Sequence, residues 1–222
     1  MDLWEAMRAR HSVRSYTDQR IEGETLNQLR QEIDVCNRES GLNIQLCLNE
    51  PGAFSSLIAH YGRLRNVRNY IALVGKKDGS LEEKCGYYGE KIVLKATQLG
   101  LDTCWVGGTY RKGKAVASVG DGEKLALVIS IGYGETHGSP RKTKPIEQLG
   151  RADGPMPDWF RRGLEAAQLA PTAINQQRFR FELQGDQVRA VALPGIFTKV
   201  DLGIAKVHFE IGAGPEGWHW AE

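Results

Sequence analysis

The sequence predicts a mixed fold of the α+β or α/β class, in which two related units follow each other along one chain. The class follows from the order of the segments, because helix-like and strand-like stretches are interleaved throughout. The relation between the units rests on a repeated pattern of glycines around an apolar helix. Gly89 and Gly100 frame the first such helix, and Gly203 and Gly214 frame the second, 114 residues further on.

Three helices are predicted in the first part of the chain. Asp2 and Glu5 form a D-x-x-E capping pattern, which begins a short helix. A second helix is expected over 24–36, where leucine and isoleucine recur at helical spacing. A long third helix ends before Gly100, a residue suited to the left-handed conformation that follows many helices. The apolar face of this third helix is formed by Tyr88, Ile92, Ala96 and Leu99.

Strands are predicted between these helices from their apolar patterns. Alternation of polar and apolar residues indicates a strand at 43–48, and a continuous apolar run indicates a buried strand at 69–74, ended by Gly75. A short strand or turn follows the long helix at 103–107, and a strongly apolar strand is expected at 124–132.

The composition changes after residue 150. The range 150–157 is rich in glycine and proline and is expected to be a linker. The elements predicted beyond it are a helix at 158–170, a hairpin of strands at 178–183 and 187–193, and a last helix at 201–212. The chain is therefore predicted to contain one unit at 1–150 and a shorter, related unit at 155–222.

The composition also argues against several functional classes. The 29 basic and 27 acidic residues leave a net charge of +2, without the basic excess typical of nucleic-acid-binding proteins. The longest apolar run, 125–131, is far shorter than the ~20 residues that span a membrane. The four cysteines lack disulfide-like spacing, and no histidine forms a zinc-like pair. We therefore expect a cytoplasmic protein that binds no metal, nucleic acid or membrane.

Two basic segments are candidates for binding a phosphate group. Arg10, Ser12 and Arg14 alternate along a segment after the first helix, so their side chains can point to one side. Guanidinium groups offer paired donors that match a phosphate dianion. Arg141 and Lys144, near the end of the first unit, can add a second cationic wall. The alternative for both segments is a solvated basic surface.

Two further segments have the chemistry to hold a flat, polar ring. The range 170–177 (A-P-T-A-I-N-Q-Q) offers a hydroxyl and three amides without any charge, which suits the edges of a heterocycle. In 103–110, Gly107 and Gly108 follow aromatic and apolar residues and would let a ring lie against bare backbone. The alternatives are an amide-rich turn and a tight turn beside a core tryptophan.

Taken together, these segments resemble the motifs of the nitroreductase family of FMN-dependent enzymes. That family carries R-x-S-x-R/K after a short helix, A-P-S-x-x-N-x-Q-P-W, and an L-G-L-x-x-x-W-x-G-G-like segment after a central helix. The sequence has R-H-S-V-R at 10–14, A-P-T-A-I-N-Q-Q at 170–177, and L-G-L-D-T-C-W-V-G-G at 99–108. The resemblance implies an α+β nitroreductase-like fold, with helices packed on mixed, antiparallel-rich sheets.

The order of the motifs departs from that of ordinary family members. Their A-P-S motif follows R-x-S-x-R/K closely, whereas here it lies about 160 residues later, and 33–44 lacks it. The P-W pair is also replaced by Arg178-Phe179. Ordinary members are homodimers that build each FMN site from both subunits. The resemblance therefore implies a fused pseudo-dimer, monomeric and with one FMN site per chain.

The resemblance also implies roles for individual residues. Arg10, Ser12 and Arg14 would hold the phosphate, the ribityl chain and the pyrimidine edge of FMN, and Gly107 and Gly108 would offer backbone N–H groups near its reactive edge. The full set of implied cofactor-binding residues is Arg10, His11, Ser12, Arg14, Trp105, Val106, Gly107, Gly108, Arg141, Lys144, Pro171, Thr172, Ala173, Asn175 and Gln176.

The activity implied by the resemblance is a two-step hydride transfer. NAD(P)H would reduce FMN and leave, and a small oxidised acceptor such as a nitroaromatic or a quinone would follow. Because the flavin carries the chemistry, no catalytic side chain is required. The alternatives are an FMN-binding sensor or carrier without efficient turnover, and a scaffold that binds no flavin.

Overall fold

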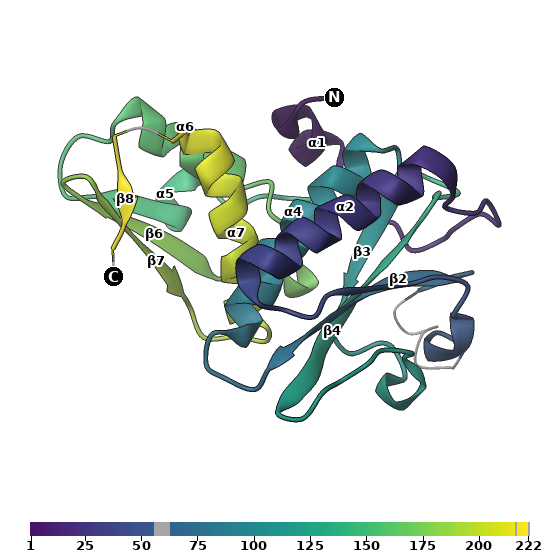
Figure 1. The fold of residues 1–222 in the computed structure, drawn as a ribbon. Helices are drawn as coiled ribbons and strands as arrows, with labels where there is room; N and C mark the ends of the chain where they lie inside the picture. The colour runs from purple at the N-terminus through teal and green to yellow at the C-terminus, as the bar shows by residue number, and fades with distance from the viewer. Residues whose placement is uncertain (56–62, 216, 222) are drawn as a thin grey trace. The chain divides into compact units, whose positions relative to one another are not determined.

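The computed structural model describes residues 1–55, 63–215 and 217–221, and the chain forms two compact units. Unit 1 consists of Met1–Arg8, Glu82–Glu90 and Arg141–Glu222, and unit 2 consists of Ala9–Leu81 and Lys91–Pro140. Each unit contains a four-stranded sheet (Figure 1), which confirms the predicted α+β class with antiparallel-rich sheets. The division into related copies at 1–150 and 155–222 stays a prediction.

The sheet of unit 2 is antiparallel throughout, with the order β1-β2-β4-β3. Its strands are β1 (Gln45–Cys47), β2 (Asn69–Lys76), β3 (Asp102–Val106) and β4 (Glu123–Gly132). The expectation that β2 ends at Gly75 is wrong, because Gly75 pairs with Lys124 and the strand continues to Lys76. The order leaves β3 at one edge of the sheet, next to β4 alone among the named strands.

Two helices of unit 2 end on left-handed glycines. Helix α2 (Gly23–Ser40) extends beyond the predicted end at residue 36 and stops at Gly41, whose φ is 69°. Helix α4 (Leu81–Gln98) contributes its second half to unit 2 and is followed by Gly100, with a φ of 77°. The predicted helix end at Gly100 is therefore confirmed. Two short 3-10 helices, η1 (Pro51–Ala53) and η2 (Lys112–Lys114), lie in the connections of this unit.

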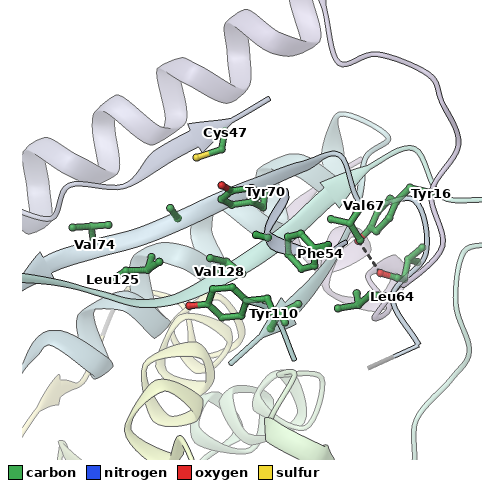
Figure 2. Packing of buried hydrophobic residues seen from close by; sticks show 14 residues of the cluster. Tyr16, Cys47, Phe54, Leu64, Val67, Tyr70, Val74, Tyr110, Leu125 and Val128 are labelled. Atoms are coloured by element: carbon green, nitrogen blue, oxygen red, sulfur yellow. Dashed lines mark hydrogen bonds between the residues drawn. The ribbon is translucent and has the colours of Figure 1, made fainter. Parts of the chain in front are cut away.

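Aromatic rings fill the centre of a buried cluster in unit 2 (Figure 2). The ring of Phe54 lies 5.7 Å from that of Tyr70 and 6.2 Å from that of Tyr110, measured between centroids. The remaining members of the cluster are Val13, Tyr16, Cys47, Ala53, Leu64, Val67, Ala72, Val74, Val106, Leu125 and Val128. Because Val13 and Tyr16 belong to it, the segment that follows residue 10 is anchored in this cluster.

The sheet of unit 1 is mixed, with the order β5-β6-β7-β8. Its strands are β5 (Gly150–Ala152), β6 (Phe179–Gln184), β7 (Gln187–Ala192) and β8 (His219–Trp220). Strands β6 and β7 form the predicted hairpin, with Gly185 at a φ of 62° in its turn. The prediction that 150–157 is a linker is wrong at its start, because β5 pairs in parallel with β6. Strand β5 has three residues, which is too short for the alternation of polar and apolar residues to predict a strand.

Glycines let two helices of unit 1 approach closely. They are α6 (Asp158–Ala167) and α7 (Thr198–Ala213). A Cβ on Gly163 would lie 2.6 Å from the ring of Phe209. A Cβ on Gly212 would lie 2.5 Å from the Cβ atom of Ala166. Helix α6 ends three residues before the predicted end at residue 170, because the N–H groups of Leu169 and Ala170 donate to carbonyl oxygens three residues earlier, in the tighter 3-10 pattern.

The remaining helices of unit 1 are short pieces at its margins. Helix α1 (Leu3–Ala9) begins with the predicted capping box: Glu5 N–H donates to Asp2 Oδ1 and Asp2 N–H to Glu5 Oε2, both at 2.8 Å. Helix α5 (Ile146–Leu149) precedes β5. Among the helices of the described residues, none has both the length and the apolar character needed to cross a membrane.

Candidate functional site

In unit 2, the segment that contains Arg10, Ser12 and Arg14 lies along the edge of the sheet. Ser12 forms a parallel bridge with Thr103 at the start of β3, and Val13 N–H donates to the Thr103 carbonyl oxygen at 3.0 Å. The backbone of this segment therefore extends the sheet beyond its edge strand. Backbone pairing of this kind fixes the place of the arginines more firmly than a surface loop would.

The polar residues of this segment differ in burial. Arg10 is only 3% exposed, although its side chain is always charged. Arg14 is exposed, and its Nη1 donates to the Ser12 carbonyl oxygen at 3.3 Å. Nδ1 of His11 lies 2.8 Å from the carbonyl oxygen of Ala9, so this ring nitrogen is used within the segment. One arginine is therefore part of the packed interior and the other is accessible to a solute.

Cys104 lies beneath the same segment and was not predicted as a site residue. Burial raises the pKa of its thiol, while nearby Arg14 and Arg10 and a hydrogen bond with Ser12 act in the opposite direction. The thiol is therefore close to all three polar groups of the motif. The sequence places Cys104 between Thr103 and Trp105 of a predicted strand. It does not show which face of the sheet the thiol points to.

A buried hydrogen-bond network anchors the segment from below. The Tyr16 hydroxyl donates to the Val13 carbonyl oxygen at 2.7 Å and lies 2.8 Å from the Ser130 hydroxyl. Ser130 in turn lies 3.3 Å from the Cys104 carbonyl oxygen and donates to it. This network connects the segment to β3 and β4 at once. Burial is the main cause that raises the pKa of Tyr16 well above its ordinary value.

The other predicted residues of unit 2 lie at the far end of β3. Trp105 is half-buried, Val106 is buried, and Gly107 and Gly108 follow the strand directly. A Cβ on Gly108 would meet no atom within 4 Å, so the space above this backbone is open. At the usual rise per residue, about 13 Å separates Gly107 from Thr103. The cationic segment and the glycines thus occupy opposite ends of one edge strand.

In unit 1, the loop 170–177 has an unusual backbone. It contains the short 3-10 helix η3 (Ala173–Asn175). Ile174, Asn175 and Gln177 have φ values of 47°, 55° and 47°, all in the left-handed region. This region is costly for a β-branched residue such as Ile174, which is also 83% exposed. Such a conformation persists only where the surroundings enforce it.

The predicted basic residue Lys144 is bound to this loop within unit 1. Its backbone N–H donates to Gln177 Oε1 at 2.7 Å, and its Nζ donates to the Gln177 carbonyl oxygen at 2.9 Å. Asn175 Nδ2 donates to the Lys142 carbonyl oxygen at 2.8 Å. The structure thus brings together the basic segment 141–144 and the loop 170–177, which the sequence predicts as separate candidates. Arg141, at the start of the basic segment, is half-buried.

Asp201, in the first turn of α7, is the main anchor of the loop and was not predicted. Its Oδ1 accepts from the Ala173 N–H at 2.9 Å, and its Oδ2 accepts from Gln176 Nε2 at 2.7 Å. Burial raises the pKa of Asp201 to about 6, against the lowering effect of these two hydrogen bonds. Only its position at a helix start was visible in the sequence, and this alone does not indicate a distant partner.

The predicted cofactor-binding residues therefore fall into two sets. The set in unit 2 comprises Arg10, His11, Ser12, Arg14, Trp105, Val106, Gly107 and Gly108. The set in unit 1 comprises Arg141, Lys144, Pro171, Thr172, Ala173, Asn175 and Gln176. In unit 2, backbone pairing with Thr103 holds the arginine segment at the start of β3, and the two glycines follow its other end. In unit 1, hydrogen bonds join Lys144 to the loop 170–177.

Comparison with known proteins places this fold among the nitroreductases. A protein from Thermotoga maritima, described as a "putative nitroreductase", has 24% identity, covers 96% of this chain and 83% of its own, and has a TM-score of 0.65. One from Desulfovibrio desulfuricans, described as a "putative nitroreductase in complex with FMN", has 18% identity, covers 71% and 99%, and has a TM-score of 0.54. The comparison with curated proteins gives no match.

The family of this protein follows from a comparison of its sequence with models of protein families. The model of the family described as "Putative TM nitroreductase" matches residues 2–213, nearly the whole chain. The protein belongs to this family, which confirms the resemblance seen in its motifs.

Proposed function

We propose that this protein is an FMN-dependent oxidoreductase that passes hydride in two steps from NAD(P)H to a nitroaromatic or quinone-like acceptor. Membership of a nitroreductase family supports the class of reaction. The observation that carries the cofactor is the arrangement along β3, with arginines and a serine at its start and two glycines after its end. FMN has a matching shape, with a phosphate at one end and a flat ring at the other.

The groups present at the start of β3 fit such a ligand. Arg14 offers an accessible guanidinium, and Ser12, two residues earlier, adds a hydroxyl. Thr103 Oγ1 is buried and has no hydrogen-bond partner among the described residues. A buried hydroxyl without a partner costs free energy, and groups of this kind often lie at functional sites.

The residues of the chain would bind and orient rather than react. FMN, when bound, supplies the hydride chemistry. The exposed Arg14 would hold its phosphate, and the buried Arg10 would add positive charge close by, which favours a bound anion. The backbone N–H groups of Gly107 and Gly108 would offer donors to the ring.

The set in unit 1 enters this proposal through its sequence motif. Pro171, Thr172, Asn175 and Gln177 match the defined positions of the family's A-P-S-x-x-N-x-Q segment, Gln176 lies between the last two, and Arg141 and Lys144 would close the phosphate site. Because each motif occurs once in the chain, we propose one FMN per chain and a monomeric protein.

The first test is the visible spectrum of the purified protein, with the released flavin counted per chain before and after anaerobic addition of NADPH or NADH. We expect about one FMN per chain, bleached by a nicotinamide donor. Bound FMN that neither donor reduces would contradict the oxidoreductase and favour an FMN carrier or sensor. A protein that takes up no added FMN would overturn the proposal as a whole.

The role of the arginine segment is tested by a matched pair of variants. Arg14→Ala should weaken FMN binding by about tenfold or more, since a hydrogen bond from a charged group contributes about 1.5–3 kcal/mol. Arg30→Ala removes an equally exposed arginine from α2 and should leave binding unchanged. Equal affinities for the two variants would show that the segment does not hold the cofactor.

A further inference from the structure

The carboxylate of Asp201 brackets the most strained part of the loop 170–177. One of its oxygens accepts from Ala173, which precedes the left-handed Ile174 and Asn175, and the other accepts from Gln176, which follows them. We propose that Asp201 is a positioning residue that sets the conformation of this loop for cofactor binding. This inference rests on the proposed function, in which the loop contributes to the FMN site.

The strain of the loop explains why such an anchor is needed. Ile174 and Asn175 adopt φ values of 47° and 55° in succession, and Gln177 adopts 47° two residues later. L-residues rarely occupy this region one after another, because the Cβ approaches the following backbone. Without an external partner, the chain would relax to an extended or right-handed conformation.

Gln176 connects the anchor to a second segment. Its Nε2 donates both to Asp201 Oδ2 and to the carbonyl oxygen of Ile196, the latter at 2.6 Å. A guanidinium nitrogen of Arg178 donates to the nearby carbonyl oxygen of Pro194. Gln176 and Arg178 are therefore both bound to the segment that leads into α7, and Gln176 is bound to Asp201 of that helix as well.

The chemistry of the site requires an acid rather than its amide. Both carboxylate oxygens receive a donor, whereas an asparagine in the same place would offer one acceptor and turn an NH₂ group toward Gln176 or Ala173. Asp201 is only 2% exposed, so keeping its charge costs solvation free energy. Burial accordingly raises its pKa. An acid on α7 that stability alone does not favour, bound to a loop with a family motif, indicates a role in positioning that loop.

The test is Asp201→Asn, which keeps the size of the side chain and removes one acceptor. At pH 8 we expect its affinity for FMN to fall about tenfold, the loss typical of one charge-assisted hydrogen bond. The unfolding midpoint of the FMN-free protein should stay the same or rise, because a buried charge has been removed. Glu165→Gln, an exposed acid on α6, is the matched control and should change neither value. Unchanged FMN affinity in Asp201→Asn would overturn the proposal, as would a parallel loss of affinity and stability.

Amide hydrogen exchange gives a readout that does not depend on flavin. The Ala173 N–H should exchange faster in Asp201→Asn than in the wild type, with helix α6 unchanged. If the wild-type protein binds no FMN, the proposed function fails and the exchange rate alone decides whether Asp201 holds the loop. If Asp201→Asn does not fold, Gln176→Ala removes the opposite partner, and the Ala173 N–H should then exchange faster than in the wild type. Unchanged exchange in that variant would contradict the proposal.

Discussion

Gly203 of α7 lies so close to Glu83 of α4 that a Cβ on the glycine would come within 2.1 Å of the Glu83 carbonyl oxygen. The contact is reciprocal, because a Cβ on Gly86 of α4 would come within 2.1 Å of the Val200 carbonyl oxygen in α7. Each glycine therefore faces the residue three positions before the other. Both contacts lie within unit 1, where the backbones of the two helices touch directly.

This contact predicts that Gly203→Ala destabilises unit 1. The new methyl group would meet backbone atoms that no rotamer change can move, and overpacking of this kind costs about 1–3 kcal/mol or more. The gain in helix propensity from glycine to alanine, about 1 kcal/mol, offsets only part of it. Urea unfolding followed by circular dichroism measures the difference. Gly113→Ala, where a Cβ meets nothing within 4 Å, should be near neutral; similar losses in both variants would contradict the contact.

The glycines that meet in this contact are not the pair that the repeated sequence pattern aligns. The sequence pairs Gly89 with Gly203 at 114 residues because it aligns the glycines after each helix, Gly100 and Gly214, which have φ values of 77° and 79°. The contact instead pairs Gly86 with Gly203, 117 residues apart. The distance along the chain from the contacting glycine to the glycine after the helix is therefore about one turn longer in α4 than in α7, since a turn takes 3.6 residues. Sequence spacing cannot separate a glycine needed for packing from one needed for termination.

Tyr16→Phe should lower the stability of unit 2 without emptying its core. The variant keeps the buried ring but removes the hydroxyl that donates to the Val13 carbonyl oxygen and meets Ser130. Leaving buried polar groups without a partner costs about 1–3 kcal/mol. Denaturant unfolding at equilibrium is the measurement. Tyr133→Phe, at a half-buried position, should cost much less, and an equal cost in both variants would argue against the network.

The sequence predicted the features that depend on near neighbours, and it missed those that depend on distant ones. The capping box of Asp2 and Glu5 and the end of α4 at Gly100 are confirmed, because each is set within one helical turn. Asp201 lies 28 residues from Ala173, whose N–H donates to its carboxylate. The spacing of residues along a helix or strand cannot predict a hydrogen bond over that distance in the sequence. The same is true of Cys104, whose neighbours lie about 90 residues earlier.

All four cysteines should resist thiol reagents in the folded protein. Each is buried and free of disulfides. Burial raises the pKa of Cys36 to about 12 and raises those of Cys47 and Cys104 as well, so little thiolate exists at pH 8. A colorimetric disulfide reagent should therefore react slowly with the native protein and with four thiols per chain in denaturant. Rapid native reaction would show that one of these side chains is accessible.

The stability of the protein should depend on pH through Asp201. The pKa of Asp201 is about 6 in the folded protein, above its ordinary 3.8, so the native state holds the proton over an interval where the unfolded chain releases it. The contribution of Asp201 to stability should therefore fall as pH rises from about 4 to about 6, by roughly 3 kcal/mol, and stay level above that. The charged groups on the surrounding elements are already engaged in part: Lys206 pairs with Glu83 at 2.9 Å, and Arg178 binds Pro194.

The stability of a whole protein depends on pH through many groups, so the informative quantity is the difference between wild type and Asp201→Asn. Lys199, exposed on α7, is present in both proteins and cancels in this difference. Urea unfolding of the FMN-free proteins from pH 4 to pH 8 should show the wild type losing stability relative to the variant as pH rises to about 6. A constant difference would mean that Asp201 keeps an ordinary pKa. A difference of opposite sign would mean that its two hydrogen bonds outweigh the cost of burial.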